Sequence, residues 1–218
     1  MATITDYGSL KTAIQTWTAR TDSVMGNQVP LFVEMAEQRL YDGSGKPGDD
    51  IYTPPLRSQT METTGTITLT EGIGAIPTNS LAIRRIYQDG DLDGLTYITP
   101  ERWSVFSAAN TAGGGGIYYT VDDGVIKVTP TDSTDLMISY YQSFDPVTPA
   151  NPTSALLTAH STLYLSACLF EAFSFMQEPT LAAGHISRLR AQISGANQTA
   201  TAMRLPTALR MRVRNHIP

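Results

Sequence analysis

The stretch NPTSALLTAHSTLYLSACLFEAFSFM, residues 151–176, decides how the rest of the chain is interpreted. Asn151 can cap a helix and Pro152 suits a first turn, so we predict that a long helix begins there. The apolar residues after this start form a wide stripe; they are Leu156, Leu157, Leu163, Tyr164, Ala167, Cys168, Phe170, Phe173 and Met176. Such a stripe indicates a helix packed against two or more partners. The polar residues that interrupt it, among them Glu171, favour a core helix over a membrane span.

Composition points to a globular chain in a compartment that does not need disulfides. The 218 residues can hold one large domain or two small ones, and a hydrophobic content of 41% is typical of folded proteins. The first residues lack the basic and apolar regions of a secretory signal, so none is expected. The single cysteine, Cys168, excludes an internal disulfide and a cysteine-built zinc site, and its apolar neighbours predict a core thiol.

Charge is distributed unevenly along the chain. All 20 acidic residues lie at or before Glu178, and residues 1–178 carry a net charge of −11, while the last forty residues carry +6. A basic segment at the end of an acidic chain is either a solvated helix and tail or an arm that docks on an acidic surface. Sequence-specific DNA recognition is not expected, because DNA-reading modules are usually basic throughout.

Two helices are predicted before residue 42. The first covers 5–20, with Thr5 or Asp6 as cap, and the second covers 27–41, with Pro30 in its first turn. The first should bury Leu10, Ile14 and Trp17; the second should bury Phe32, Met35, Ala36 and Leu40 and expose Glu34, Glu37 and Arg39. Residues 42–55 are rich in Gly, Pro and Asp and predict a long exposed loop that either makes contacts or is disordered.

A β-rich region follows, because from Ser58 the apolar period changes from helical spacing to alternation. The predicted strands cover 61–69, 81–87, 95–99, 117–121, 125–129 and 136–141. Asp123-Gly124 is a strong hairpin signal. Between the third and fourth strands, Thr99 and Pro100 start a short helix whose Trp103 and Phe106 can reach the core.

Helices return after residue 145. Glu178-Pro179 ends the central helix and starts another, whose apolar row is Ala182, Ile186, Leu189 and Ile193, and Pro206 ends what remains of it. The predicted class is α+β: about four bundled helices with an inserted small antiparallel β domain and an extended arm. The boundaries are 1–57 and 145–203 for the helical domain, 58–144 for the β domain and 204–218 for the arm.

The sequence signals for catalytic, cofactor and metal sites are weak, and no such site is predicted. The three histidines show no metal-ligand spacing, and His160 is expected to be a partly buried structural residue. Residues 89–94 open like a calcium loop with Asp89, Asp91 and Asp93, but no bidentate acid occupies the twelfth position, and a hairpin turn is the alternative. The glycines at 113–116 lack the lysine that follows a phosphate-binding loop.

The order of motifs resembles the head-to-tail adaptor (connector) proteins of tailed bacteriophages across residues 3–200. The matching segments are MATITDYGSLKTAIQTWTARTD (1–22), VPLFVEMAEQRL (29–40), Arg57 with the strand at 61–69, IPTNSLAIRRIY (76–87), YITPERW (97–103), the tyrosine pair at 140–141 and NPTSALLTAHSTLYLSACLFEA (151–172). Their order and spacing together carry the resemblance. The loop at 42–55 and the arm after Leu205 lie outside it.

The resemblance implies a structural virion protein made in the host cytoplasm and placed in the neck between head and tail. Such adaptors form a ring of about twelve copies around the DNA channel, with the portal protein on one side and a tail or nozzle protein on the other. No cofactor, catalytic residue or membrane contact is implied. We expect the portal interface to consist of Arg204, Leu205, Leu209, Arg210, Met211, Arg212, Val213 and Arg214. The loops at 42–55 and 110–116 are expected to contact neighbours or tail components.

Two alternatives of other kinds are considered. A tail-completion protein of a long-tailed phage differs mainly in the ring that it binds. A virion-associated cell-wall hydrolase needs paired carboxylates, for which Glu34, Glu62 or Glu101 are available although their spacing singles out none of them.

Overall fold

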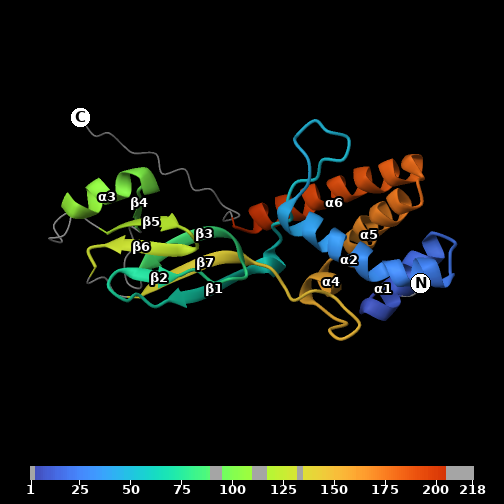
Figure 1. The fold of residues 1–218 in the computed structure, drawn as a ribbon, viewed down its shortest axis with the longest axis horizontal. Helices are drawn as coiled ribbons and strands as arrows, with labels where there is room; N and C mark the ends of the chain where they lie inside the picture. Colours follow the sequence, from blue (N-terminus) through green and yellow to red (C-terminus); the bar gives the residue numbers. More distant parts are fainter. Residues whose placement is uncertain (1–2, 89–94, 110–116, 132–134, 205–218) are drawn as a thin grey trace, which may run out of the picture. The chain divides into compact units, whose positions relative to one another are not determined.

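The computed structural model describes residues 3–88, 95–109, 117–131 and 135–204 (Figure 1). The chain divides into two compact units. A helical unit comprises Met1–Thr60 and Asp145–Pro218, and a β-rich unit, Met61–Phe144, separates these two segments in the sequence. The combination of helices and small sheets confirms the predicted α+β class.

Helix α5 is the centre of the helical unit. The helices of this unit are α1 (Tyr7–Trp17), α2 (Ser23–Asp42), α4 (Ala155–Ala159), α5 (Ser161–Phe175) and α6 (Pro179–Arg204). Helix α5 packs against α6, α2 and α1, and ten of its fifteen residues are buried. The prediction that this helix has several partners is therefore confirmed. The predicted apolar row of α6, Ala182, Ile186, Leu189 and Ile193, is also buried.

The predicted single helix from Asn151 to Met176 is wrong at its start, because the chain forms two helices here. Ser154 caps α4 by accepting a hydrogen bond from Leu157 N–H at 3.0 Å, and the chain turns at His160 before α5 begins. Asn151 and Pro152 precede both helices. The carbonyl of Pro152 accepts from Tyr7 N–H at 2.7 Å, so it serves the start of α1.

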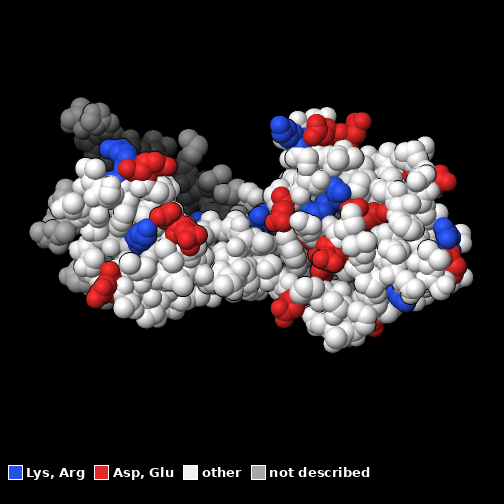
Figure 2. All heavy atoms as spheres, in the orientation of Figure 1, with Lys and Arg blue, Asp and Glu red and all other residues white. Residues whose placement is uncertain are grey.

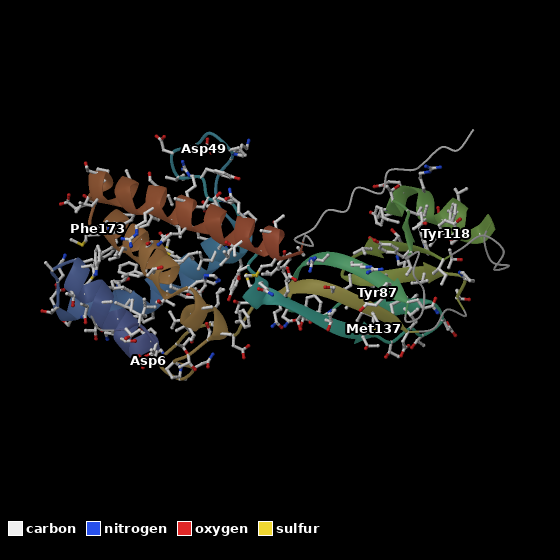
Figure 3. The ribbon with its side chains drawn as sticks, turned by 180° about the vertical axis from the view of Figure 1, so that it is seen from behind. Asp6, Asp49, Tyr87, Tyr118, Met137 and Phe173 are labelled. Atoms are coloured by element: carbon white, nitrogen blue, oxygen red, sulfur yellow. The ribbon has the colours of Figure 1, made fainter. Side chains whose placement is uncertain are left out.

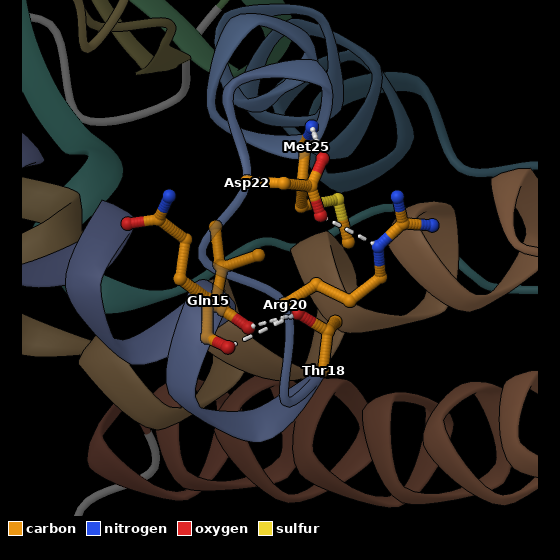
Figure 4. Close-up of polar contacts among 6 residues, drawn as sticks. Gln15, Thr18, Arg20, Asp22 and Met25 are labelled. Carbon is orange, nitrogen blue, oxygen red and sulfur yellow. Dashed lines mark hydrogen bonds and ion pairs between the residues drawn. The ribbon is translucent and has the colours of Figure 1, made fainter.

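Helix α2 begins at Ser23, four residues before the predicted start, because Asp22 provides the cap (Figure 4). Asp22 accepts hydrogen bonds from Arg20 Nε at 2.8 Å and from Met25 N–H at 3.0 Å. These two bonds, the arginine first, lower the pKa of Asp22 from 3.8 to about 2. Pro30 consequently lies inside the helix instead of in its first turn.

Several side chains of α1 and α2 lie on the opposite side from the one predicted. Glu37 is buried and Arg39 is largely covered, although both were expected to face water. Trp17 and Met35 were expected in the core, but 53% and 42% of their surfaces are exposed. The reason is the position of α5, which covers the α2 face that carries Val33 and Glu37.

The β-rich unit contains two sheets. The three-stranded sheet has the order β1 (Glu62–Ile67), β7 (Leu136–Gln142), β3 (Ser80–Gln88), and the four-stranded sheet has the order β2 (Ile73–Ala75), β6 (Val125–Thr129), β5 (Tyr118–Asp122), β4 (Thr96–Tyr97). Their shared core consists of Ile67, Ile86, Ile126, Val128, Leu136, Ile138 and Tyr140. Helix α3 (Pro100–Ala109) packs on β5, where the Phe106 and Tyr118 rings lie 4.6 Å apart (Figure 3).

Local signals predicted most of these strands. The hairpin at Asp123-Gly124 is confirmed: both residues have positive φ, 49° and 72°, and they join β5 to β6. Strand β2 was not predicted, because it has only three residues and its buried position is Gly74. The strand pairs are antiparallel, as predicted, except that β4 pairs with β5 in parallel.

Candidate interaction surfaces

Most of the predicted portal interface lies outside the described residues. Arg204 is the last residue of α6. Leu205, Leu209, Arg210, Met211, Arg212, Val213 and Arg214 follow it and are not described. The calcium-like pattern at 89–94 and the loop at 110–116 are also outside the described residues. The roles assigned to these segments therefore stay predictions.

The one cysteine and the central histidine occupy structural positions. Cys168 is fully buried, which confirms the predicted core thiol, and burial raises the pKa of this thiol. His160 is partly buried, and burial lowers its pKa below the usual value. Over the described ranges, no group of three or more His, Cys, Asp or Glu side chains could hold a metal ion, and every helix is too short or too polar to span a bilayer.

Three polar atoms converge on one cavity of the helical unit. Ser58 Oγ, His160 Nε2 and Gln192 Oε1 are buried without a hydrogen-bond partner among the described residues, and all three side chains line a cavity of about 410 Å³. Sequence patterns could not reveal this cluster because its members come from three distant segments.

A buried carboxylate joins three segments of the helical unit. Glu37 Oε1 accepts hydrogen bonds from Val147 N–H at 3.0 Å and from the Tyr164 hydroxyl at 2.9 Å. Burial raises the pKa of Glu37, although the two hydrogen bonds act in the opposite direction. Because both donors lie far along the chain from Glu37, this contact ties α2 to the segment before α4 and to α5.

A second charged contact on α2 lies beside the first. Arg39 Nε donates to Glu171 Oε1 at 2.9 Å, with only 12% and 5% of the two side chains exposed. The guanidinium of Arg39 also lies 4.5 Å from the centre of the Phe170 ring. Arg39 was expected to face water, yet its ion pair with Glu171 joins α2 to α5.

The loop at 42–55 is exposed over most of its length but is held at its base. Ser44 and Thr53 form an isolated antiparallel bridge. Arg190 of α6 donates to the carbonyl oxygens of Tyr52 at 2.9 Å, Asp50 at 2.8 Å and Asp49 at 3.3 Å. Figure 3 shows Asp49 on this loop, next to α6. Charged side chains gather at the tip of the loop in Figure 2. The loop therefore exposes charged side chains while the bridge and Arg190 hold its backbone.

An apolar groove lies between α1 and α5. We call it the α1–α5 groove; it has a volume of about 810 Å³ and is lined by Thr3, Ile4, Ser9, Thr12, Ala13, Thr16, Trp17, Ser161, Thr162, Leu165, Ser166, Leu169 and Arg188. Trp17, at its rim, contacts the His185 ring edge-on with ring centres 6.1 Å apart. Arg188 is the only charged residue among these lining residues.

Helix α2 presents an exposed apolar row, which we call the α2 ridge. It consists of Val24, Leu31 and Met35, of which 56%, 47% and 42% are exposed. Their spacing of seven and four residues places them on one stripe of the helix, and the exposed Glu34 lies beside them. Surface patches of this kind are typical of protein contacts. The sequence did not point to the ridge or the groove, and it assigned Met35 and Trp17 to the core.

The carboxylates considered for a hydrolase lie on three different elements. Glu34 is on α2, Glu62 is on β1 and Glu101 is in the first turn of α3. Glu62 accepts from Arg84 Nη1 at 2.5 Å, so it takes part in an ion pair within the three-stranded sheet.

Comparison with known proteins identifies a family. A protein-family model described as "SU10 adaptor protein" matches residues 5–212. No individually curated protein matches the chain. The matched region includes every helix and strand described above, and so extends over both structural units.

Proposed function

The chain belongs to the SU10 adaptor protein family and is a structural adaptor protein of a phage, and on this basis we propose that it is the head-to-tail adaptor of the virion. In this role it sits in the neck, between the portal of the capsid and the tail or nozzle, and surrounds the channel through which DNA leaves. The observation that carries the proposal is the family match over residues 5–212, nearly the whole chain.

The adaptor forms a ring of about twelve copies, because repetition around a symmetric portal multiplies individually weak contacts. The charge of the chain supports a channel role. With a net charge of −5 the protein repels DNA, so a genome can slide past it without being gripped. No sequence-specific contact with DNA is needed.

Portal attachment is assigned to the segment at 204–218. The residues proposed to make this contact are Arg204, Leu205, Leu209, Arg210, Met211, Arg212, Val213 and Arg214. Their support is compositional: the segment has four arginines, no acidic residue and several apolar side chains that can act as anchors. Loops at 42–55 and 110–116 would then be available for neighbouring or tail proteins.

The direct test is native mass spectrometry of the full chain, alone and mixed with the portal ring of the same virus. Addition of about twelve copies to each portal ring is the expected result. If no copies bind at any concentration, the head-to-tail proposal is wrong. A parallel mixture with purified tails tests the alternative role, because a tail-completion protein would bind the tail ring and not the portal.

Deletion of residues 204–218 should abolish attachment to portal rings while circular dichroism and thermal unfolding stay unchanged, because this segment follows the packed part of α6. A matched variant with Arg204, Arg210, Arg212 and Arg214 replaced by lysine keeps the charge and should retain part of the binding. Full attachment by the deletion variant would refute the assigned interface and leave the ring proposal intact.

A further inference from the structure

The α2 ridge and the α1–α5 groove are two different exposed surfaces of one compact unit. The ridge is an outer face of α2, since Val29, Val33 and other residues of the helix are buried and α2 packs on α5 and α1. The groove lining includes residues of α1, α5 and α6 but none of α2. Neither surface therefore covers the other within one copy.

Helix α1 separates the two surfaces. The side chains of Lys11 and Gln15 approach α2, where a Cβ added at Gly26 would lie 3.4 Å from Gln15 Nε2. Thr12 and Thr16, which line the groove, follow these residues by one position and so point from a different face of α1. The α2 ridge and the α1–α5 groove therefore face in different directions.

Charge selects between the possible occupants of the groove. Its one charged lining residue is Arg188, and it has no acidic one. The basic segment at 204–218 would bring like charges together there. The ridge instead carries Glu34 between Leu31 and Met35, so a ridge placed in the groove pairs opposite charges at the edge of an apolar contact. Trp17 at the rim is the residue type that most often dominates such contacts.

We propose that the α2 ridge of one copy docks into the α1–α5 groove of the next copy, with Glu34 facing Arg188, and that this contact closes the ring. The inference rests on the proposed ring function. A contact between two unlike surfaces propagates from copy to copy and closes when the rotation fits, whereas a ridge-to-ridge contact would stop at a dimer.

Cysteine cross-linking on assembled portal rings tests the pairing, because the only natural cysteine is fully buried. The ridge variant is Met35→Cys and the groove variant is Thr16→Cys, both at exposed positions. Under oxidation the double variant should give a ladder of covalent multimers on a non-reducing gel. An equimolar mixture of the two single variants should stop at dimers, and each single variant alone should stay monomeric.

Four outcomes would overturn the proposal. Dimers of Met35→Cys alone would indicate ridge-to-ridge packing. A ladder of equal yield from the control pair Met35→Cys with Thr201→Cys, whose second site is exposed on α6 away from the groove residues, would indicate unspecific contact. Rings that native mass spectrometry detects on the portal but that give no ladder would mean that other surfaces form the ring, and the adaptor role would still stand. If no ring forms at all, both proposals fail.

Charge reversal gives an independent measurement. Glu34→Arg and Arg188→Glu should each weaken ring formation on the portal by on the order of tenfold, because each places like charges together. The double reversal should recover most of the loss. Trp17→Ala should weaken ring formation by at least about tenfold. If the double reversal is as weak as the two single changes combined, Glu34 and Arg188 do not face each other.

Discussion

At the scale of single residues, Glu37 has the most demanding environment in the helical unit. Its carboxylate is buried, and it is the acceptor for a backbone donor at Val147 and for the Tyr164 hydroxyl. Removing such an acceptor leaves buried donors without a partner, which costs more than the hydrogen bonds themselves contribute. Glu37 therefore links three segments of the unit, although burial disfavours the ionised form of its carboxyl group.

Replacing Glu37 by alanine should lower the free energy of unfolding by about 1–3 kcal/mol for each of the two donors left without a partner. Glu37→Gln keeps an acceptor oxygen of the same reach and should lose much less. Urea unfolding of both variants beside the parent chain measures the difference. Equal losses in the two variants would mean that packing, and not the acceptor, is what Glu37 contributes.

The raised pKa of Glu37 also predicts a pH dependence. Since the folded state favours the protonated carboxyl, the contribution of this group to the free energy of unfolding is fully present below its ordinary value of 4.5. It falls as the pH rises from 4.5 through the folded-state pKa. The stability of the parent chain should therefore decline relative to Glu37→Gln across that window. A difference that is constant with pH would contradict the assignment.

At the scale of elements, Arg190 joins α6 to the 42–55 loop through three side-chain hydrogen bonds. Its guanidinium donates to the loop carbonyls of Asp49, Asp50 and Tyr52. This planar fork is a geometry that lysine cannot reproduce. The bridge between Ser44 and Thr53 also holds the loop. Further bonds run from Arg39 to the Ile51 carbonyl and from Asn197 to the Pro55 carbonyl.

Arg190→Ala should increase the rate of proteolytic cleavage within residues 44–53 by on the order of tenfold, because a released loop reaches the protease more often. Arg190→Lys should behave nearly like alanine. Arg188→Ala, an exposed arginine on the same helix, is the matched control and should cleave like the parent chain. An unchanged cleavage rate in Arg190→Ala would show that the other contacts of the loop are sufficient to hold it in place.

Two glycines test how tightly the elements pack. A Cβ at Gly74 in β2 would lie 2.3 Å from Ile67 Cγ2, whereas a Cβ at Gly184 in α6 would meet nothing within 4 Å. Gly74→Ala should lower the free energy of unfolding of the β-rich unit by about 1–3 kcal/mol. Gly184→Ala should raise that of the helical unit by about 0.5–1 kcal/mol. Thermal unfolding of both variants checks the opposite signs.

Local sequence patterns predicted which helices and strands form better than they predicted where each begins or which residues it packs against. The alternation that begins near Ser58 and the apolar row of α6 are visible in the sequence because each repeats over several residues. The start of α4 was misjudged because Asn151 and Ser154 both can cap, and the contact between Tyr7 and Pro152 decides between them. Burial of Glu37 depends on donors 110 and 127 residues away.

The ridge and the groove were missed for the same reason. Helical spacing identifies an apolar stripe but does not say which part of it a neighbouring helix covers. Met35 and Trp17 were assigned to the core, yet α5 lies against other faces of α2 and α1. Only the positions of all helices distinguish an interior residue from one available to another molecule.

At the scale of the whole molecule, the β-rich unit has its two ends on neighbouring strands. Glu62 at the start of β1 pairs with Tyr141 near the end of β7. The unit also has a core of its own, formed by both sheets. An inserted segment whose two ends lie close together and which has its own hydrophobic core can fold independently of the unit that contains it.

The fragment comprising residues 61–144 should therefore fold when produced alone, with strand-type circular dichroism and a cooperative thermal transition. The fragment comprising residues 1–60 should not, because α1 and α2 lack α5, on which they pack. Dispersed amide signals in an NMR spectrum of the first fragment and not of the second would agree. An unfolded 61–144 fragment would mean that its core depends on the helical unit.

The location of the β-rich unit between α2 and α5 also sets an order of events during synthesis. The ribosome releases α1 and α2 before α5 exists, and at roughly 5–20 residues per second the residues that cover Phe32 emerge many seconds later. In that interval the nascent chain has an uncovered apolar surface that a chaperone can bind. Once the strands pair, β1 and β7 close the long insertion into a short bridge, which spares the two halves of the helical unit most of the entropy of finding each other.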